Sequence, residues 1–284
     1  MDYKKAKNFI SEFELCDFNN EEKVANYVSF FSLDQVCRPI EEDQMPKDQL
    51  FSVSLSIINT PELQDMAPYQ PVFGDLCRLH YIILSNKMIN VLEFGSGFSS
   101  VVIAHALMIL KNEFLGWAED NLRSKNPFKL FSVDENEYFS NLTTKRLGDD
   151  LQEYATISSS SVSLKTHDMR YCTVYDINPN VSPDFILLDG PDQYAVKDSI
   201  NGFHISDPAR MPMSADILGF EFFLNPGTLI LVDGRTANVR FLQKYLKRNW
   251  VHSHDVDGDV HYLLLEEEPF GLYNKCIMDF KNND

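Results

Sequence analysis

From about residue 90 onward, short apolar runs alternate with longer segments in which apolar residues recur every three or four positions. The short runs are typical of buried strands, and the longer spacing is typical of helices that pack on a sheet through one face. The sequence therefore predicts strands at residues 90–94, 129–134, 161–166, 184–189 and 228–233. It predicts helices at residues 99–110, 137–151, 214–224 and 236–248. Strands that alternate with helices predict an α/β fold with a doubly wound, mostly parallel sheet.

The last predicted strands are connected differently. Residues 251–256 and 259–266 flank the dipeptide Asp257-Gly258, which is a strong signal for a two-residue hairpin. We therefore expect the sheet to end in an antiparallel hairpin. A plain nicotinamide-binding domain is not expected to end in this way.

The residues before the first strand show a different pattern. Residues 21–36 and 71–87 have helical spacing, and turn-forming residues lie between them. We divide the chain into an N-terminal helical cap at 1–71, a main domain at 72–267 and a polar tail at 268–284. The tail is expected to be partly disordered, and residues 111–127 are expected to form an enlarged connection.

Acidic residues stand at the ends of the better-defined strands. They are Glu93, Asp134, Asp189 and Asp233. The carboxyl ends of parallel strands share one edge of a sheet, and ligands bind beyond that edge. We therefore expect these carboxylates to converge on one rim.

The first strand runs into a turn that contains Gly95 and Gly97 before an apolar helix begins. The two glycines let the backbone swing sharply and approach a ligand closely, and the helix start offers unpaired N–H groups. A dinucleotide would bring its pyrophosphate to such a turn, where the carboxylate of Glu93 would repel it. S-adenosylmethionine carries a sulfonium and an ammonium but no phosphate. The acidic turn therefore favours this cofactor.

Net charge narrows the range of partners. The 284 residues include 25 Lys and Arg against 42 Asp and Glu, a formal charge of −17. Such a chain repels a phosphate backbone unless a basic stripe compensates, and the sequence shows no such stripe. We expect no nucleic-acid partner, and the oligomeric state stays open.

Cysteine usage and apolar runs favour a soluble, cytoplasmic protein. Five cysteines are scattered without a C-x-x-C pair, which argues against a disulfide framework and a structural zinc site. The first residues contain no secretory apolar region. The longest apolar stretch, at residues 101–110, is far below the roughly 20 residues that span a bilayer. No membrane partner is expected.

Four segments together resemble the class I S-adenosylmethionine-dependent methyltransferases, in the branch that acts on small molecules at oxygen. In chain order they are residues 91–99 with the glycine turn, residues 131–134, residues 183–191 and residues 226–233. The resemblance runs from about residue 69 to residue 267. It implies a sheet of seven strands with the last one antiparallel, in agreement with the predicted hairpin.

The resemblance also implies roles for individual residues. Gly95 and Gly97 would let the backbone approach the methionine part of the cofactor, and Glu93 would lie beneath it. Asp134 would bind the two ribose hydroxyls, and Asp168 is a candidate for the adenine contact. The implied cofactor-binding set is Glu93, Gly95, Ser96, Gly97, Phe98, Ser99, Asp134, Glu135, Asp168 and Asp189.

Asp189 and Asp233 are the predicted catalytic residues. The acceptor must be held in line with the methyl group, and a hydroxyl acceptor must also lose a proton. In catechol-type relatives two such aspartates and a following asparagine bind a divalent cation, but Gly234 and Arg235 follow Asp233 here. A metal is therefore not predicted, although metal dependence stays open. Arg235 is either a grip for a carboxylate or phosphate of the acceptor or a solvated residue at a helix start.

Three histidines are predicted to share one face of the terminal hairpin. His252 and His254 alternate along a strand, and the tight turn places His261 opposite His254. Such a face is either ordinary exposed sheet, which is the commoner case, or a transition-metal site.

Four further residues are candidates for the site. His167 and His204 lie on predicted loops near the rim, and either one is a candidate base. Tyr69 and Gln70 precede the helix that leads to the first strand, so they either line the mouth of the site or form a turn.

Together these observations predict methyl transfer from S-adenosylmethionine to a small-molecule acceptor, at oxygen, with the N-terminal helices forming the acceptor pocket. Methylation at nitrogen is a weaker hypothesis, because Gly190 interrupts the signature with which amino-methylating relatives hold a planar amine. A non-catalytic S-adenosylmethionine-binding protein, an NAD-dependent oxidoreductase and an aminopropyl transferase also stay open. The sequence does not identify the acceptor.

Overall fold

A computed structural model describes residues 2–40, 70–124, 126–207 and 209–282. In this part of the chain seven strands form one sheet in the order β3-β2-β1-β6-β7-β9-β8. The strands are β1 (Asn90–Phe94), β2 (Lys129–Asp134), β3 (Ala155–Ser159), β6 (Phe185–Leu188), β7 (Leu229–Asp233), β8 (Trp250–Asp255) and β9 (Val260–Leu265). The first five are parallel, and β9 is antiparallel to both β7 and β8. The predicted doubly wound sheet with a terminal antiparallel hairpin is confirmed.

The register of the central strands brings the predicted acidic residues together. Phe94 pairs with Val133 on one side and with Leu188 on the other, and Leu188 pairs with Val232. The next residues along the four strands are therefore neighbours at the carboxyl edge: Gly95, Asp134, Asp189 and Asp233. Glu93 lies two rows further back, opposite Ser132 and Leu187. We call this edge the rim.

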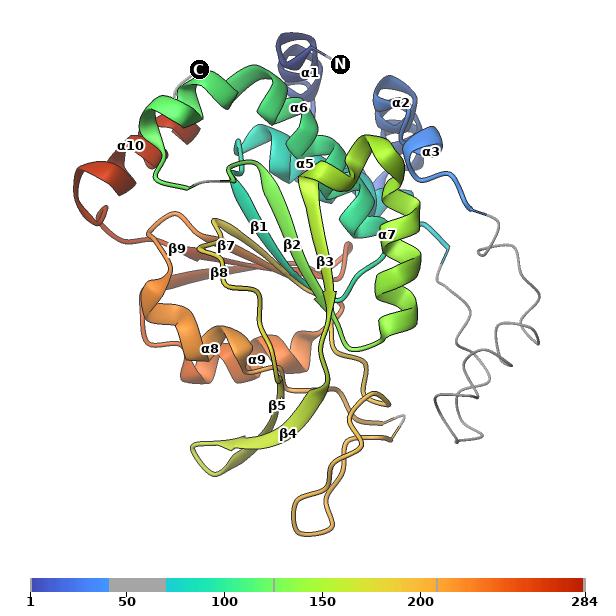
Figure 1. Ribbon diagram of the computed structural model, residues 1–284, viewed down its shortest axis with the longest axis vertical. Helices are drawn as coiled ribbons and strands as arrows, with labels where there is room; N and C mark the ends of the chain where they lie inside the picture. The colour runs from blue at the N-terminus through green and yellow to red at the C-terminus, as the bar shows by residue number, and fades with distance from the viewer. Residues whose placement is uncertain (1, 41–69, 125, 208, 283–284) are drawn as a thin grey trace.

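Helices cover both faces of the sheet (Figure 1). The helices of the first face are α1 (Tyr3–Ile10), α2 (Glu21–Phe31), α3 (Leu33–Val36), α5 (Phe73–Ser85), α6 (Phe98–Asn121), α7 (Glu137–Leu151) and α10 (Gly271–Asn282). Those of the second face are α8 (Asp216–Phe220) and α9 (Thr236–Tyr245). Successive strand residues alternate between the two cores, so Val91 packs in the first and Leu92 in the second.

The longest helix is α6, which starts directly after the glycine turn. This helix of 24 residues is long and apolar enough to cross a membrane by length and composition, but 61% of its most apolar 18-residue window is buried inside the protein. Burial of this kind is typical of the central helix of an α/β domain. The prediction that residues 111–127 form an enlarged connection is therefore wrong for residues 111–121, which continue the helix.

The third strand of the sheet is not the predicted one. Residues 161–166 were expected in the sheet, but β4 (Val162–His167) pairs only with β5 (Arg170–Tyr175) in a separate antiparallel hairpin. The strand beside β2 is β3, which has a weakly apolar sequence that ends in serines. Both segments fit an extended backbone, and only the pairing partner distinguishes them.

The C-terminal tail is ordered up to residue 282. It was expected to be partly disordered, but α10 packs on α6 through Phe280, whose ring stacks on that of Trp117 at 3.8 Å. Packing of this aromatic side chain stabilises the helix on α6.

The N-terminal helices share the core of the main domain. Phe18 and Tyr27 stack edge to face at 5.2 Å, and the Tyr27 hydroxyl lies 3.0 Å from Nδ1 of His80 on α5. The short helix η1 (Leu15–Asn19) packs on α5 near the rim. A cap boundary at residue 71 stays a prediction, because residues 41–69 lie outside the described part.

Candidate active site

The turn between β1 and α6 packs directly on the loop that follows β6. The Gly95 N–H donates to the Val133 carbonyl over 2.9 Å, and the Gly95 carbonyl accepts from the Ser132 hydroxyl over 2.9 Å. Gly95 has a φ of +96°, and a Cβ at this residue would lie 3.2 Å from the Gly190 nitrogen. Glycine is therefore required here both by conformation and by space.

Glu93 is completely enclosed beneath this turn. Its Oε1 accepts from the Ser99 hydroxyl over 2.6 Å and its Oε2 accepts from the Ser100 hydroxyl over 2.5 Å. Burial raises the pKa of Glu93 to about 7, and the serine hydrogen bonds oppose this rise. Because the side chain is 0% exposed, its charge can act on a ligand but its oxygens cannot contact one.

Asp134 lies beside the turn and is bonded to it. Its Oδ2 accepts from the Ser96 hydroxyl over 2.7 Å, and its Oδ1 accepts from the Asn136 N–H over 2.8 Å. Burial also raises the pKa of this carboxyl, while the two hydrogen bonds oppose the rise. The carboxylate is thus held in one orientation at the end of β2, and each oxygen keeps a lone pair for a further donor.

Glu135 links the end of β2 to two other segments. Its Oε2 accepts from the Tyr175 hydroxyl over 3.0 Å, and its Oε1 accepts from the Asp192 N–H over 2.9 Å. Burial and the neighbouring charge of Asp134 raise the pKa of Glu135 to about 7. Sequence reasoning missed Tyr175, because its place in the site depends on β5 folding back toward the rim.

Gly190 separates the glycine turn from Tyr175. A Cβ at this residue would lie 2.6 Å from the Tyr175 hydroxyl oxygen and 2.7 Å from the Gly95 nitrogen. No side chain fits between these atoms. This contact explains why glycine follows Asp189 where the amine-binding signature would have a larger residue.

Asp189 and Arg235 interact across the ends of β6 and β7. The Arg235 Nε lies 3.8 Å from Asp189 Oδ1, Nη1 donates to the Pro191 carbonyl over 2.9 Å, and Nη2 donates to the Asp189 carbonyl. The Arg235 side chain is only 13% exposed, whereas that of Asp189 is 54% exposed. Burial of the surrounding rim raises the pKa of Asp189 to about 6, and Arg235 opposes this rise.

Asp233 lies in a strongly acidic environment at the tip of β7. Burial, Asp189 and Asp75 raise its pKa to about 7, and only Arg78 among the larger influences lowers it. The Arg78 Nη1 donates to Asp75 Oδ1 over 2.7 Å, and its Nη2 donates to Asn19 Oδ1 over 2.7 Å. Asp75 and Arg78 were not predicted, although their i,i+3 spacing in the first turns of α5 is a visible signal for an ion pair.

Of the remaining predicted cofactor residues, Phe98 lies at the turn and Asp168 does not. Phe98 is buried at the start of α6 under the guanidinium of Arg146, which lies 4.1 Å from the ring centre. Asp168 occupies the turn at the tip of the β4–β5 hairpin, whereas Tyr175 at the other end of β5 is the residue that contacts the rim. Six residues of strand separate the two ends by about 20 Å. The hairpin therefore places Asp168 away from Tyr175, and its contact with the cofactor stays a prediction. Tyr69 lies outside the described residues.

The segment that pairs with β2 also decides which residues lie beside Asp134. The residue that follows β3 is Ser160, which is buried beside Asp134 and whose N–H donates to the Asp134 carbonyl over 2.9 Å. The residues that follow β3 therefore lie next to Asp134 at the rim.

His167 and His204 were the candidate bases. Within the described residues, no contact places either of them at the rim. The ring of His167 packs against Tyr245 at the end of α9, with 4.9 Å between ring centres. His204 is exposed, and its carbonyl accepts from Arg210. Gln70 is exposed just before α5.

The three histidines of the terminal hairpin do cluster as predicted. His254 pairs with His261 in register and their rings stack at 3.7 Å, while Nε2 of His252 lies 3.0 Å from Nδ1 of His261. Nε2 of His261 lies 2.9 Å from the Thr236 hydroxyl. Within the described residues, no group of three or more His, Cys, Asp or Glu side chains is arranged to hold a metal ion, and this cluster is no exception.

Comparisons with known proteins add little to this geometry. No protein family model and no curated protein matches the sequence. Three similar solved structures are the tomaymycin O-methyltransferase TomG of Streptomyces achromogenes with S-adenosylmethionine, the Podospora anserina methyltransferase PaMTH1 with S-adenosylhomocysteine, and an O-methyltransferase of Bacillus cereus with S-adenosylhomocysteine.

These similarities are weak. Identities are 13%, 11% and 11%, and TM-scores are 0.40, 0.41 and 0.36, in the same order. The matches cover 86%, 87% and 85% of this chain and 96%, 97% and 99% of the others. Similarity at this level carries no weight for function, so the functional assignment depends on the residues of the rim.

Proposed function

We propose that this protein transfers a methyl group from S-adenosylmethionine to a small-molecule acceptor, at oxygen. The observation that carries the proposal is the enclosed carboxyl of Glu93 beneath the Gly95–Gly97 turn, with Asp134 at the end of the neighbouring strand β2. A turn of this kind places negative charge where a dinucleotide would place its pyrophosphate. A sulfonium and an ammonium are stabilised there, and a diphosphate is repelled.

The residues of the rim fit this cofactor. Five carboxyl groups gather along it, at Glu93, Asp134, Glu135, Asp189 and Asp233, and the nearby cations Arg78 and Arg235 are both bonded to protein groups. Asp134 would accept from the ribose hydroxyls, because Ser96 and the Asn136 N–H fix its two oxygens and each oxygen keeps a free lone pair. Gly95, Ser96 and Gly97 would lie against the methionine part, and Ser160 against the base.

S-adenosylmethionine would supply an electrophilic methyl group. Asp233, with a pKa near 7, is matched to accept a proton from a hydroxyl acceptor at neutral pH. Asp189 would orient the acceptor, because it is the most exposed carboxylate of the rim and Arg235 holds it. We assign Arg235 to the positioning of Asp189 rather than to an anionic acceptor, since its nitrogens already bond to the loop after β6.

Calorimetric titration tests the cofactor. The protein should bind S-adenosylmethionine and S-adenosylhomocysteine and should not bind NAD. Asp134→Asn should weaken S-adenosylhomocysteine binding by roughly tenfold to a hundredfold, because a charged hydrogen-bond acceptor is lost. Binding of NAD alone would instead indicate an oxidoreductase.

Turnover requires a second experiment. Candidate acceptors are screened with radiolabelled methyl donor, in parallel with magnesium and with a chelator. Product formation that survives the chelator supports transfer without a metal, and product that needs magnesium would overturn the assignment of Asp189 and Asp233 as metal-free acid–base groups. Asp233→Asn should lower turnover by about a hundredfold while cofactor affinity changes little. Cofactor binding with no turnover of any acceptor would favour a non-catalytic binding protein.

A cytoplasmic location is part of the same proposal. All five cysteines lie in the described part of the chain and none is bonded to another, which suits a reducing compartment.

A further inference from the structure

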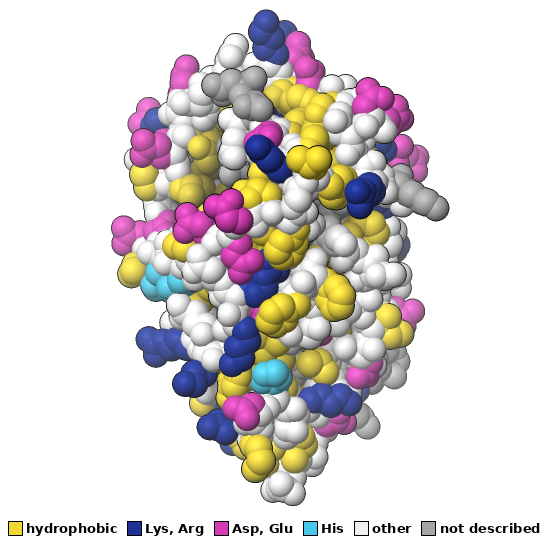
Figure 2. Space-filling view, turned by 90° about the vertical axis from the view of Figure 1, so that its left-hand side faces the viewer, with side chains coloured by type: hydrophobic (Ala, Val, Ile, Leu, Met, Phe, Trp, Pro, Cys, Tyr) yellow, Lys and Arg dark blue, Asp and Glu magenta, His cyan; other side chains and the backbone are white. Residues whose placement is uncertain are grey.

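Four large apolar side chains are exposed at the amino ends of the parallel strands, away from the rim. Phe222 and Phe223 belong to η5 (Glu221–Phe223), which precedes β7, and they are 67% and 81% exposed. Phe270 and Leu272 follow β9, at the start of α10, and they are 54% and 86% exposed. Figure 2 views the molecule from the side on which α8 and α10 lie in Figure 1, and hydrophobic side chains reach its surface at several places.

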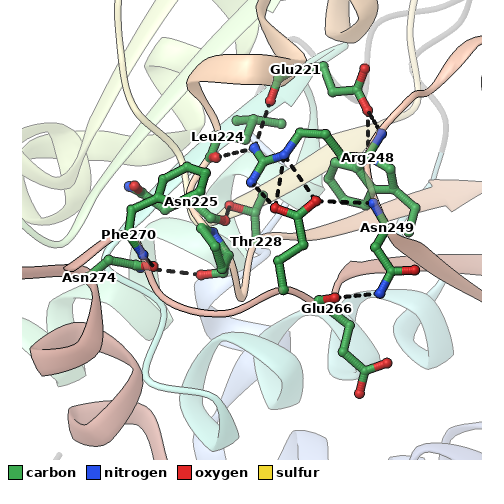
Figure 3. A network of polar contacts seen from close by, with 12 residues as sticks. Glu221, Leu224, Asn225, Thr228, Arg248, Asn249, Glu266, Phe270 and Asn274 are labelled. Atoms are coloured by element: carbon green, nitrogen blue, oxygen red, sulfur yellow. Dashed lines mark hydrogen bonds and ion pairs between the residues drawn. The ribbon is translucent and has the colours of Figure 1, made fainter.

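One buried arginine brings these two segments together (Figure 3). The Arg248 Nη1 donates to the Glu221 carbonyl over 3.1 Å, and its Nη2 pairs with Glu267 over 2.6 Å. The same guanidinium lies 4.8 Å from the centre of the Phe270 ring. η5 and the start of α10 are therefore neighbours, and these contacts fix the backbone on both sides. We call the four exposed side chains the apolar patch: Phe222, Phe223, Phe270 and Leu272.

Exposed charges of both signs border the apolar patch. Lys247 lies at the η5 end, where its backbone N–H donates to the Glu221 carboxylate over 2.9 Å. Glu266 and Glu268 flank Glu267, and Figure 3 shows Glu221 and Glu266 at opposite ends of the arginine network. Within the described residues, the side chains of Lys247, Glu266 and Glu268 form no ion pair and no hydrogen bond. Their charges are therefore available to a binding partner.

The arrangement of this face is complementary to itself. An apolar patch on the surface of a globular protein marks an interaction site, and aromatic side chains are enriched at such sites. A cation at one end and carboxylates at the other end match a second, inverted copy of the same surface. The formal charge of −17 makes two copies repel each other elsewhere, so a face that also offers an unpaired cation is the favourable place for contact.

We propose that the apolar patch binds a second copy of this chain about a two-fold axis. Under this symmetry the same surface is used twice, so η5 of one protomer faces the start of α10 of its partner. Phe222 and Phe223 are then covered by apolar side chains of the other protomer, and Lys247 faces Glu266 of the partner subunit. Burial of aromatic side chains stabilises the dimer, and the two ion pairs fix its orientation.

Analytical ultracentrifugation tests whether the apolar patch holds a dimer. The wild-type protein should sediment as a dimer, and Phe223→Asp should raise the dissociation constant at least tenfold, because a buried aromatic side chain is replaced by a charge. Met169→Asp is the control, because Met169 is equally exposed but lies at the tip of the β4–β5 hairpin, and it should change the constant less than twofold. A wild-type protein that stays monomeric up to about 0.1 mM, or equal effects of the two variants, would overturn the proposal.

Charge reversal tests the two-fold arrangement. Lys247→Glu and Glu266→Lys should each weaken self-association by about tenfold, because like charges then meet twice in each dimer. A mixture of the two variants should form heterodimers that are tighter than either homodimer, since every reversed charge then faces an opposite one. Native mass spectrometry distinguishes the three species by mass.

Lys165→Glu provides the control for a change in net charge. This exposed lysine lies on β4, away from the apolar patch, so the variant should self-associate like the wild-type protein. Thermal melting confirms that each variant is folded. A mixture of Lys247→Glu and Glu266→Lys that associates no better than the separate variants would show that the two ends do not meet, and the proposal would be wrong.

Titration with S-adenosylhomocysteine keeps the dimer and the methyl-transfer proposals distinct. Phe223→Asp should leave S-adenosylhomocysteine affinity unchanged, because the apolar patch and the rim lie at opposite ends of the parallel strands. Failure of the wild-type protein to bind S-adenosylhomocysteine would reject the methyl-transfer proposal and leave the dimer standing.

Discussion

Glu93 combines complete burial with a charge that the proposed cofactor would need. Its two oxygens are used by Ser99 and Ser100, so the side chain holds the start of α6 in place and also places a carboxyl under the glycine turn. Burial of this group costs stability when it is ionised, as the raised pKa shows. Retaining such a group at a turn is expected where a positively charged ligand compensates.

Glu93→Gln separates the charge of this residue from its shape. The variant should bind S-adenosylmethionine about tenfold more weakly, because the interaction of a carboxylate with the sulfonium is lost. S-adenosylhomocysteine has no sulfonium, so its affinity should fall by a smaller factor. Calorimetry with both ligands measures the difference, and Glu137→Gln, an exposed residue in the first turn of α7, is the control. Equal losses for the two ligands would contradict the electrostatic role.

Gly190 is required by its neighbours rather than by its own conformation. In Gly190→Ala the added methyl group would lie within 3 Å of the Tyr175 hydroxyl and the Gly95 nitrogen, so the glycine turn must shift. We expect a loss of about 1–3 kcal/mol of folding stability together with weaker S-adenosylhomocysteine binding. Gly219→Ala in α8 is the control, because a Cβ there meets no atom within 4 Å. Urea unfolding and calorimetry measure both effects, and similar behaviour of the two variants would contradict the packing explanation.

At the scale of elements, one arginine connects three segments at the amino end of the sheet (Figure 3). The Arg248 Nη2 pairs with Glu267 over 2.6 Å, and its Nη1 donates to the Glu221 carbonyl over 3.1 Å and also to the Leu224 carbonyl. The Glu221 carboxylate accepts from the Arg248 N–H and from the Trp250 indole. These bonds hold the start of β8 against η5 (Glu221–Phe223) and the segment after β9.

Removing this arginine should loosen the terminal hairpin. The Arg248 side chain is 5% exposed, so Arg248→Ala leaves two carbonyls without this donor and the Glu267 carboxylate with only the Asn249 N–H. We expect a loss of about 3–5 kcal/mol of folding stability, which urea unfolding measures. Arg240→Ala on the exposed side of α9 should change stability by less than about 0.5 kcal/mol. S-adenosylhomocysteine affinity should stay the same in Arg248→Ala at temperatures where the protein is folded, since the network lies away from the rim.

The elements that the sequence predicted best are strands that have a neighbouring strand on both sides. The strands at residues 90–94 and 129–134 match the structure at both ends, because their apolar side chains are buried on both faces of the sheet. The hairpin around Asp257-Gly258 was predicted from its turn alone, and the pairing of His254 with His261 followed. The strand beside β2 was missed because its serines give no apolar pattern.

For the whole molecule, buried carboxyls and buried histidines make stability depend on pH in opposite directions. The pKa of Glu93, of Glu135 and of Asp233 is raised to about 7 in each case. Each folded carboxyl keeps its proton where the unfolded chain has lost it, so its contribution to stability is lost as pH rises from about 4 toward 7. Burial lowers the pKa of His80 and lowers that of His105 to about 4, so their contribution to stability increases with pH up to about 6.5.

The two effects oppose each other below pH 6.5, and only the carboxyls still titrate above it. Because three carboxyls outweigh two histidines below pH 6.5, we expect the melting temperature to fall as pH rises from 5 to 8. Differential scanning calorimetry over this range measures the change. Glu93→Gln should show a smaller fall, because one of the three carboxyls is absent. A melting temperature that rises between pH 6.5 and 8 would show that these groups are ionised in the folded protein.

The local sequence was sufficient for the fold class, the order of most strands and helices, and the acidic residues at the strand ends. These features depend on apolar periodicity, glycine and turn residues, which are local properties of a chain. The contacts of Tyr175 with Glu135, of Gly190 with Gly95, of Asp75 near Asp233 and of Phe280 with Trp117 join residues that are 40 or more positions apart. Pairing and packing at such separations depend on which surfaces meet when the chain collapses, and no neighbouring residues encode that choice.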